Sequence, residues 1–271
     1  RPGMGKTAFI LSMLKRMTVD NHIPAMLFSL EVNEYQIANR LLSCVCEIPC
    51  EKLKKGLLAP YEWGQLDYKI KELNDAPLYL DTAAALTIEE LCQKAQNAVK
   101  EYGVGLIVID YLQLLYQKIA YSESRYTELN YFTRRLKSLA KELNIPIIIT
   151  SQLNRETERR GGLNGGRPQL SDLRDSGTIC DDCDMVCFIH RPEYYHIYQD
   201  EQGYDLHGVA EFQIAKQRNG TLGKILLHFR EEYACFYPIE QQKEMKQAVR
   251  PSRISPSEQP PFNFPIPDAP F

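Results

Sequence analysis

The residues with the clearest chemistry stand at the very beginning of the chain. Gly3-Met4-Gly5-Lys6-Thr7 matches the end of the phosphate loop Gly-x-x-x-x-Gly-Lys-Thr and precedes an apolar helical pattern. Gly5 lets the backbone approach a phosphate, and the loop N–H groups and the helix N-terminus attract its charge. Lys6 would reach the β- and γ-phosphates, and Thr7 would offer a hydroxyl to Mg²⁺. The motif predicts a nucleoside triphosphate site; the alternative is a glycine-rich turn before a helix.

Three further polar residues each follow a short apolar run, as residues at the ends of buried strands do. Asp110 can hold the shell of a magnesium ion, and Glu31 can orient and polarise an attacking water. Gln152 can sense a γ-phosphate and pass the signal to the next loop. Asp110 could instead begin a turn, and Glu31 could be a charge near a helix start. Their convergence with a phosphate loop at the carboxyl ends of strands is far more specific than any one of them.

The segment from Gln152 to Thr178 is polar and glycine-rich and carries arginines but no lysine. These arginines are Arg155, Arg159, Arg160, Arg167 and Arg174. Guanidinium groups suit phosphate oxygens, and few aromatic residues accompany them, so the segment favours sequence-independent contact with a nucleic-acid backbone. A solvated loop whose charges are balanced by neighbouring acids is the alternative.

Alternating strand and helix patterns must position these residues. The expected buried strands are Ile23–Leu30, Leu78–Leu80, Leu106–Ile109, Pro146–Thr150 and Met185–Ile189. The expected helices are Thr7–Val19, Tyr35–Cys46, Tyr61–Leu73, Ile88–Tyr102 and Glu128–Leu143. This alternation predicts an α/β fold with a mostly parallel sheet between helices. Val209–Gln217 and Lys224–Arg230 flank Asn219-Gly220 and predict an antiparallel hairpin that closes the sheet, with a further strand within Tyr233–Tyr237.

Composition agrees with a globular chain. The 271 residues are 44% hydrophobic and 25% charged, with a net charge of −3, so any contact with nucleic acid must be local. We expect one domain over 1–240 and a disordered proline-rich tail over 241–271. No apolar run approaches the roughly 20 residues that cross a bilayer. The first glycine of the full phosphate loop would precede Arg1, so we expect the chain to be cut inside this loop, without the strand that leads into it.

Eight cysteines without a secretory signal indicate reduced thiols in a cytosolic protein. Cys180, Cys183 and Cys187, with His190 beyond them, raise the alternative of a zinc site. The stretch enters an expected strand, where ligands would face alternate sides of the sheet. We therefore favour free thiols, and stoichiometric zinc in the purified protein would contradict this.

Seven motifs together resemble one family. In chain order they are GMGKT, FSLE, IDYLQL, LKSLAKELNIP, SQLNR, LSDLRDSG and AKQRNG. Over roughly residues 1–237 they resemble the motor domain of bacterial DnaB-type replicative helicases. The resemblance implies a RecA-like P-loop NTPase fold and a homohexameric ring with ATP and Mg²⁺ bound at subunit boundaries. It also implies that the ring encircles single-stranded DNA, moves 5′ to 3′ and displaces the other strand, in the cytoplasm on the nucleoid.

The resemblance assigns roles to individual residues. Gly3 to Thr7, including Met4, would bind the triphosphate, and Thr7 and Asp110 would hold the metal. Glu31 would be the catalytic base and Gln152 the γ-phosphate sensor. The residues expected to face the DNA backbone are Arg174, Asp175 and Gly177, and those inserted into the neighbouring subunit's site are Lys216 and Arg218. An arginine supplied in trans can contribute a factor of about 10³–10⁵ in rate.

The resemblance also implies partners, a primase and a helicase loader, and leaves two other functions open. The family's N-terminal domain and linker helix are not in this sequence, so we expect the chain alone to form hexamers weakly or not at all. A RecA-like recombinase or branch-migration ATPase would share the phosphate loop, Asp110 and Glu31; the SQLNR, DLRDSG and KQRNG series favours the helicase. A non-motor ATP-binding switch or interaction protein would not need the full set of catalytic residues.

Overall fold

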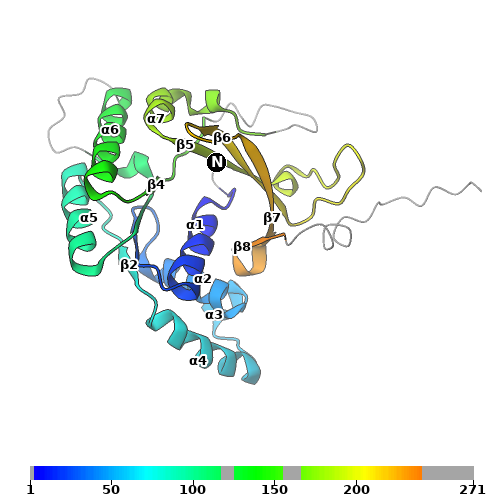
Figure 1. Ribbon diagram of the computed structural model, residues 1–271. Coiled ribbons are helices and arrows are strands. Elements are labelled where there is room, and N and C mark those ends of the chain that lie inside the picture. The colour runs from blue at the N-terminus through cyan, green and yellow to red at the C-terminus, as the bar shows by residue number, and fades with distance from the viewer. Residues whose placement is uncertain (1–2, 117–124, 155–165, 240–271) are drawn as a thin grey trace, which may run out of the picture.

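The computed structural model describes residues 3–116, 125–154 and 166–239 (Figure 1). The expected tail, 241–271, and Arg155, Arg159 and Arg160 lie outside the described residues. The described part contains two four-stranded sheets. No helix of this part is both long enough and apolar enough to cross a membrane.

The first sheet is parallel throughout and has the strand order β2-β1-β3-β4. Its strands are β1 (Ala25–Ser29), β2 (Leu78–Asp81), β3 (Leu106–Asp110) and β4 (Ile147–Ile149). Every residue of β1 and β3 is buried, as the continuous apolar runs predict for strands covered on both faces. Four of the five expected strands are therefore confirmed as neighbours in one parallel sheet, although β2 and β4 are only partly buried.

Helices cover both faces of this sheet. The longer ones are α1 (Lys6–Leu14), α2 (Glu34–Cys46), α4 (Pro60–Asn74), α5 (Ile88–Tyr102) and α6 (Arg125–Leu143). Alternate strand residues divide between two cores: Phe28 and Ile109 pack with α5 and α6, whereas Leu27 and Val108 pack with α1 and α2. The five expected helices are confirmed. The apolar periodicity of α5 matches the face that it buries, whereas α4 packs against α2 and its buried residue is Glu62.

Shorter helical turns connect these elements. They are the π-helix Lys15–Asp20, α3 (Cys50–Lys55), α7 (Gly177–Asp182) and the 3₁₀ helices Leu112–Leu114, Leu170–Ser176, Pro192–Tyr195 and Glu231–Tyr233. Sequence patterns predicted none of them except the π-helix, which continues α1 to Asp20 along the helix expected to reach Val19. Turns of this length bury too few residues to leave a periodic pattern.

The second sheet is antiparallel and has the order β5-β6-β7-β8. Its strands are β5 (Met185–His190), β6 (Val209–Gln217), β7 (Gly223–Arg230) and β8 (Cys235–Pro238). The expectation that Met185–Ile189 joins the parallel set is wrong, because this strand pairs with β6 instead. The β6–β7 hairpin and the last strand are confirmed, although the hairpin belongs to a separate sheet.

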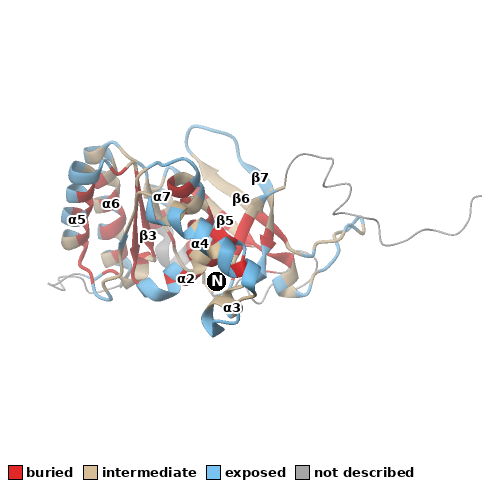
Figure 2. Cartoon of the chain, turned by 90° about the horizontal axis from the view of Figure 1, so that it is seen from below, coloured by how far each residue is buried: buried red, intermediate tan, exposed pale blue. Residues whose placement is uncertain are grey.

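Helix α1 lies between the two sheets (Figure 1). Figure 2 shows buried residues in strands of both sheets. One side of α1 packs on β1 and β3 through Leu11 and Leu14. Its other side meets the antiparallel sheet, where Ala8 packs against Phe229 and Phe236. The backbone N–H of Phe236 also donates to Ser12 Oγ at 2.9 Å. The helix that begins at the phosphate loop is thus held by both sheets.

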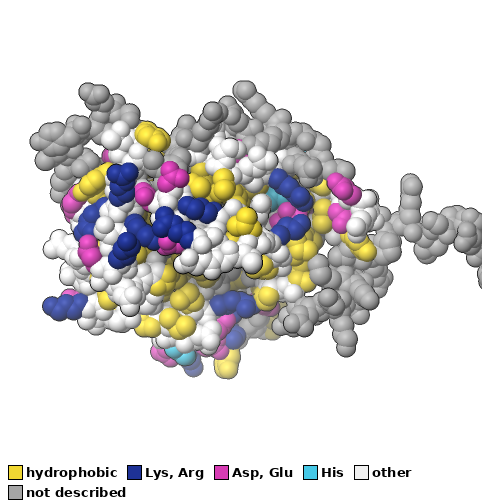
Figure 3. Space-filling view, turned by 45° about the horizontal axis from the view of Figure 1, so that its top comes forward, with side chains coloured by type: hydrophobic (Ala, Val, Ile, Leu, Met, Phe, Trp, Pro, Cys, Tyr) yellow, Lys and Arg dark blue, Asp and Glu magenta, His cyan; other side chains and the backbone are white. Residues whose placement is uncertain are grey.

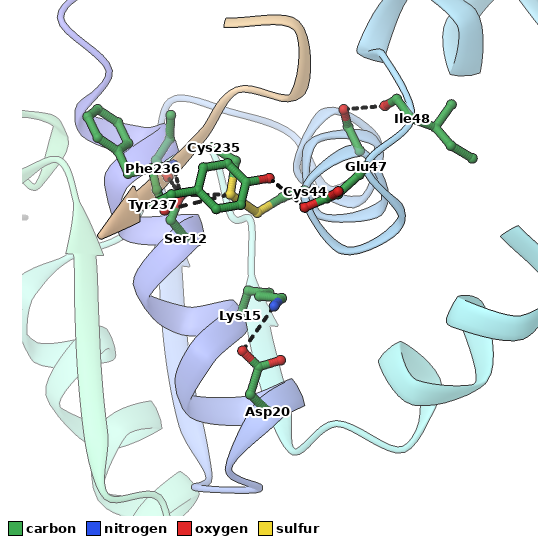
Figure 4. Close-up of a disulfide and its surroundings, with 11 residues drawn as sticks. Ser12, Lys15, Asp20, Cys44, Glu47, Ile48, Cys235, Phe236 and Tyr237 are labelled. Carbon is green, nitrogen blue, oxygen red and sulfur yellow. Dashed lines mark hydrogen bonds and ion pairs between the residues drawn. A yellow bond between two sulfur atoms is a disulfide. The ribbon is translucent and has the colours of Figure 1, made fainter. Parts of the chain in front are cut away.

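Strand β8 is also joined covalently to α2 (Figure 4). Cys44 of α2 and Cys235 of β8 form a disulfide with a Cα–Cα distance of 5.5 Å across a sequence separation of 191 residues. The prediction of eight reduced thiols is therefore wrong for this pair. The number of cysteines does not indicate which two of them pair when they are so far apart in the sequence. The other six cysteines are free.

Candidate nucleotide site and the hairpin arginine

The phosphate loop has the backbone that its glycines predict. Gly3 and Gly5 have φ angles of 80° and 87°, in the left-handed region that side chains with a Cβ rarely adopt. Both also lack room for one: a Cβ on Gly3 would lie 2.9 Å from the ring of Tyr194, and a Cβ on Gly5 would lie 3.0 Å from the ring of Phe236. Gly5 caps α1 without a side-chain hydrogen bond, so the first-turn N–H groups remain available to an anion.

Asp110 and Thr7 come together in the way a magnesium site requires. Thr7 Oγ1 donates to Asp110 Oδ2 at 2.7 Å, and Thr150 Oγ1 donates to Asp110 Oδ1 at 2.5 Å. The Asp110 carboxylate is only 2% exposed, and both of its oxygens accept from hydroxyls. Carboxylate and hydroxyl oxygens are the ligands that Mg²⁺ prefers, so these residues fit the predicted metal.

Lys6 is a half-buried cation whose surroundings suit a phosphate. Burial lowers the pKa of Lys6, and the charges of Asp110 and Glu31 raise it in part. Among the described residues, the one hydrogen bond from Lys6 Nζ goes to the carbonyl oxygen of Ser151, at 3.3 Å. The ammonium also lies 5.6 Å from the ring centroid of Tyr111. A cation so placed, without a carboxylate in direct contact, is suited to receive an anionic ligand.

The carboxyl ends of β1 and β3 lie at the same edge of the sheet. Ser29 is in register with Asp110, and the N–H of Leu30 donates to the carbonyl of Asp110 at 2.8 Å. Glu31 follows directly, is exposed, and lies close enough to influence the pKa values of both Lys6 and Tyr111. The structure thus brings the phosphate loop, Asp110 and Glu31 together, as the sequence predicts.

Ser151 connects Lys6 to the segment that follows β3. Gln113 Nε2 donates to Ser151 Oγ at 2.7 Å, and Ser151 Oγ donates to the carbonyl of Gln152 at 3.2 Å. Gln152 itself is half-buried beside these groups. Sequence reasoning placed Ser151 and Gln152 at a strand end but missed Gln113, although a polar residue inside the apolar IDYLQL run was a usable signal.

Arg191 is a second residue that sequence reasoning missed. Its side chain is 7% exposed, its guanidinium carbon lies 4.0 Å from the ring centroid of Phe229, and Nη1 donates to the carbonyl of Gly3 at 3.4 Å. This contact and the ring of Tyr194 support the phosphate loop from the antiparallel sheet. A charged residue directly after the apolar run of β5 was the only signal in the sequence.

His190, one residue earlier, is almost fully buried. Its exposed fraction is 2%, and burial lowers its pKa to about 4. Glu211 raises this pKa in part, whereas Arg167 and Lys224 lower it further. The imidazole therefore stays neutral near neutral pH, and its ring stacks on Tyr195 with centroids 5.5 Å apart.

Lys216 and Arg218 do not join this site within their own chain. Their side-chain hydrogen bonds go to the end of α7: Lys216 Nζ donates to the carbonyls of Cys180 and Asp181, and Arg218 Nη2 donates to the carbonyl of Asp181 at 2.7 Å. The described part of the molecule thus keeps both hairpin cations away from Lys6. This arrangement leaves them to act elsewhere.

The remaining expected residues are only partly described. Arg174 and Asp175 belong to the 3₁₀ helix Leu170–Ser176, but their side chains lie outside the described residues; Gly177 begins α7. Among the described residues, no three His, Cys, Asp or Glu side chains lie close enough together to hold a metal ion. His190, for its part, stands at the opposite end of β5 from Cys183.

Comparisons with known proteins agree with this geometry. A family model described as the DnaB-like helicase C terminal domain matches residues 1–238. The chain is 37% identical over 240 residues to the replicative DNA helicase DnaB of Geobacillus stearothermophilus and 35% identical over 240 residues to the replicative DNA helicase DnaC of Bacillus subtilis. Each match covers 89% of this chain and 51% of the relative, so the chain spans about half the length of these relatives.

Two solved structures share the fold. One is described as an ATPase domain; it has a TM-score of 0.80 and 35% sequence identity, and the match covers 89% of this chain and 82% of that one. The other is described as a DnaB-like replicative helicase with its interactions with primase; it has a TM-score of 0.80 and 34% identity, and the match covers 89% of this chain and 56% of that one. Both likenesses support the expected P-loop NTPase fold.

Proposed function

The chain belongs to the family of DnaB-like helicase C-terminal domains, and on that premise we propose that it is the ATP-driven motor of a replicative DNA helicase. The motor would form a homohexamer, move 5′ to 3′ on single-stranded DNA and unwind the duplex. Primase and a helicase loader would be its partners, since a structural relative is described with primase. We expect it to act in the cytoplasm on the nucleoid.

One observation carries the proposal: a half-buried lysine, a threonine and a buried carboxylate converge beside the glycine loop at the start of α1. Lys6 would bind the β- and γ-phosphates, because its half-buried side chain has no carboxylate in direct contact within the described residues. Thr7 and Asp110, joined at 2.7 Å, would hold Mg²⁺. When bound, the ion neutralises charge on the β- and γ-phosphate oxygens.

The other residues would complete hydrolysis. Glu31, exposed at the same sheet edge, would orient a water and accept its proton. Gln152 would sense the γ-phosphate. It follows Ser151, whose carbonyl accepts the hydrogen bond from Lys6, and its own carbonyl accepts from the Ser151 hydroxyl. Arg174, Asp175 and Gly177 would face the DNA backbone. Lys216 and Arg218 would enter the neighbouring subunit's site, which fits their described contacts with α7 in their own chain.

Hydrolysis by the full-length protein, with and without single-stranded DNA, tests this function. We expect DNA to stimulate hydrolysis, and Arg218→Ala to lose most of the rate, within the factor of about 10³–10⁵ typical of a trans arginine, while still binding ATP. Arg230→Ala is a matched control, since this arginine lies on the same sheet and its described contact is with the Tyr237 ring. Hydrolysis that ignores DNA, or survives loss of Arg218, would favour a non-motor ATP-binding role.

A further inference from the structure

Strand β6 ends in a hairpin whose two cations are held by the neighbouring helix α7. Besides the carbonyl contacts of its guanidinium, Arg218 donates its backbone N–H to the carbonyl of Asp184 at 2.9 Å. Cys180 and Asp181, which supply the other acceptors, lie in the last turn of α7. Carbonyls of a last helical turn have no partners within the helix and carry the negative end of its dipole. They therefore suit two neighbouring cations.

Asp184 makes charged contacts with both α6 and the hairpin. Its Oδ1 lies 3.5 Å from Arg218 Nη1, and its Oδ2 accepts from Lys137 Nζ of α6. The hydrogen bond from Lys137 lowers the pKa of Asp184, and the charges of Lys137 and Arg218 lower it further, so the carboxylate stays ionised. One aspartate thus bridges α6 and the hairpin.

Helix α7 is itself fixed to α6. Thr133 Oγ1, on a residue of α6 that is only 3% exposed, donates to Asp182 Oδ2 at 2.8 Å. Leu173 packs against β5 in a small apolar cluster with Val186 and Phe188. The carbonyls and the carboxylate that receive the hairpin cations therefore stand on a supported base rather than on a free loop.

The face formed by these elements is rich in cations. Figure 3 brings α6 and α7 forward and shows Lys and Arg side chains gathered there. The side chain of Arg218 on this face is 47% exposed, and among its described contacts the one with an anion is that with Asp184. Asp184 supplies that anion, and it can set the direction in which the guanidinium points.

We propose that Asp184, supported by Lys137, is a positioning residue that holds Arg218 ready to enter the site of the adjacent subunit. The inference rests on the proposed function, because it needs Arg218 to act in trans. It predicts that a defect at Asp184 appears in the subunit that donates the arginine and not in the subunit that binds the nucleotide.

The size of the effect follows from exposure. Asp184 and Arg218 have side chains that are 63% and 47% exposed. Exposed ion pairs contribute about 0.2–1 kcal/mol, and 1.36 kcal/mol corresponds to a factor of ten. Asp184→Asn should therefore lower kcat by about 1.5- to fivefold and leave KM for ATP unchanged, far less than the loss of Arg218 itself.

Mixed hexamers of the full-length protein separate the two positions. Lys6→Ala subunits lack a working site but carry the arginine, and Arg218→Ala subunits have the reverse defect, so activity returns only where the two kinds meet. Asp184→Asn is then added to one kind or the other. Glu72→Gln is the matched control, since Glu72 is a half-exposed carboxylate paired with Lys69 at 2.9 Å, away from the hairpin.

We expect the recovered kcat to fall only when Asp184→Asn is on the Lys6→Ala subunits, with Glu72→Gln silent in both. Equal loss in both positions, loss only on the Arg218→Ala subunits, or no loss at all would overturn the inference, because a purely structural or absent role predicts those results. No recovery of activity in the parent mixture would instead overturn the trans role of Arg218, and with it the proposed function.

Discussion

Gly5→Ala tests how tightly the antiparallel sheet constrains the phosphate loop. Two costs add at this position. The φ angle of 87° is left-handed, which costs a residue with a Cβ about 1–2 kcal/mol. The new Cβ would also lie 3.0 Å from the ring of Phe236, and overpacking of this kind costs about 1–3 kcal/mol.

Gly103→Ala provides a control within the same chain. Gly103 caps α5 with a φ of 65°, and nothing lies within 4 Å of a Cβ built there. This variant carries the backbone cost alone. The difference between the two variants in free energy of unfolding therefore isolates the contact of Gly5 with Phe236, which we expect to be about 1–3 kcal/mol.

Urea unfolding of the 271-residue chain and binding of a fluorescent ATP analogue are the two measurements. We expect Gly5→Ala to be the less stable variant and to bind at least about tenfold more weakly, a loss of about 1.4 kcal/mol, because the loop backbone must move to relieve the contact. Gly103→Ala should bind normally. Equal stabilities together with normal binding by Gly5→Ala would refute the claim that Phe236 constrains the loop.

Two further predictions concern His190 and the Cys44–Cys235 disulfide. Since the pKa of His190 is depressed to about 4, protons favour the unfolded chain below about pH 6.5; urea unfolding should show about 2 kcal/mol lost between pH 8 and pH 5. His190→Phe should remove this loss, and an unchanged pH dependence would contradict it. Reduction of the disulfide should lower stability by about 2–5 kcal/mol, and a melting temperature equally sensitive to reductant in Cys44→Ala/Cys235→Ala would argue against that bond.

Local patterns predicted most of the parallel half of the fold. β1 and β3 were visible because strands covered on both faces are apolar throughout. The expected range Ile88–Tyr102 equals α5, and in the structure Thr87 and Gly103 cap its two ends. The same criterion, a short apolar run, gave the wrong sheet for Met185–Ile189. A short apolar run reports burial, but only the pairing of β5 with β6 determines which sheet it enters.

The residues of the candidate site also differ in how far a local sequence pattern could predict them. Residue type and spacing were enough to recognise the short motifs that contain Gly5, Lys6, Thr7 and Asp110. Arg191 contacts Gly3 across a separation of 188 residues, a contact that one sequence does not encode in any local pattern. Supporting residues of this kind become visible only when the two sheets are placed on either side of α1.

That placement has a mechanical consequence for the proposed motor. Ala8 and Leu11 of α1 pack against different sheets. A shift of the phosphate loop would therefore displace contacts with both sheets. The parallel sheet carries Asp110, and the antiparallel sheet carries Arg218 at the far end of β6. In the proposed motor, a nucleotide at Lys6 would therefore be linked through packed elements both to Thr7 and Asp110, which we propose hold Mg²⁺, and to Arg218, which we propose acts in the next subunit.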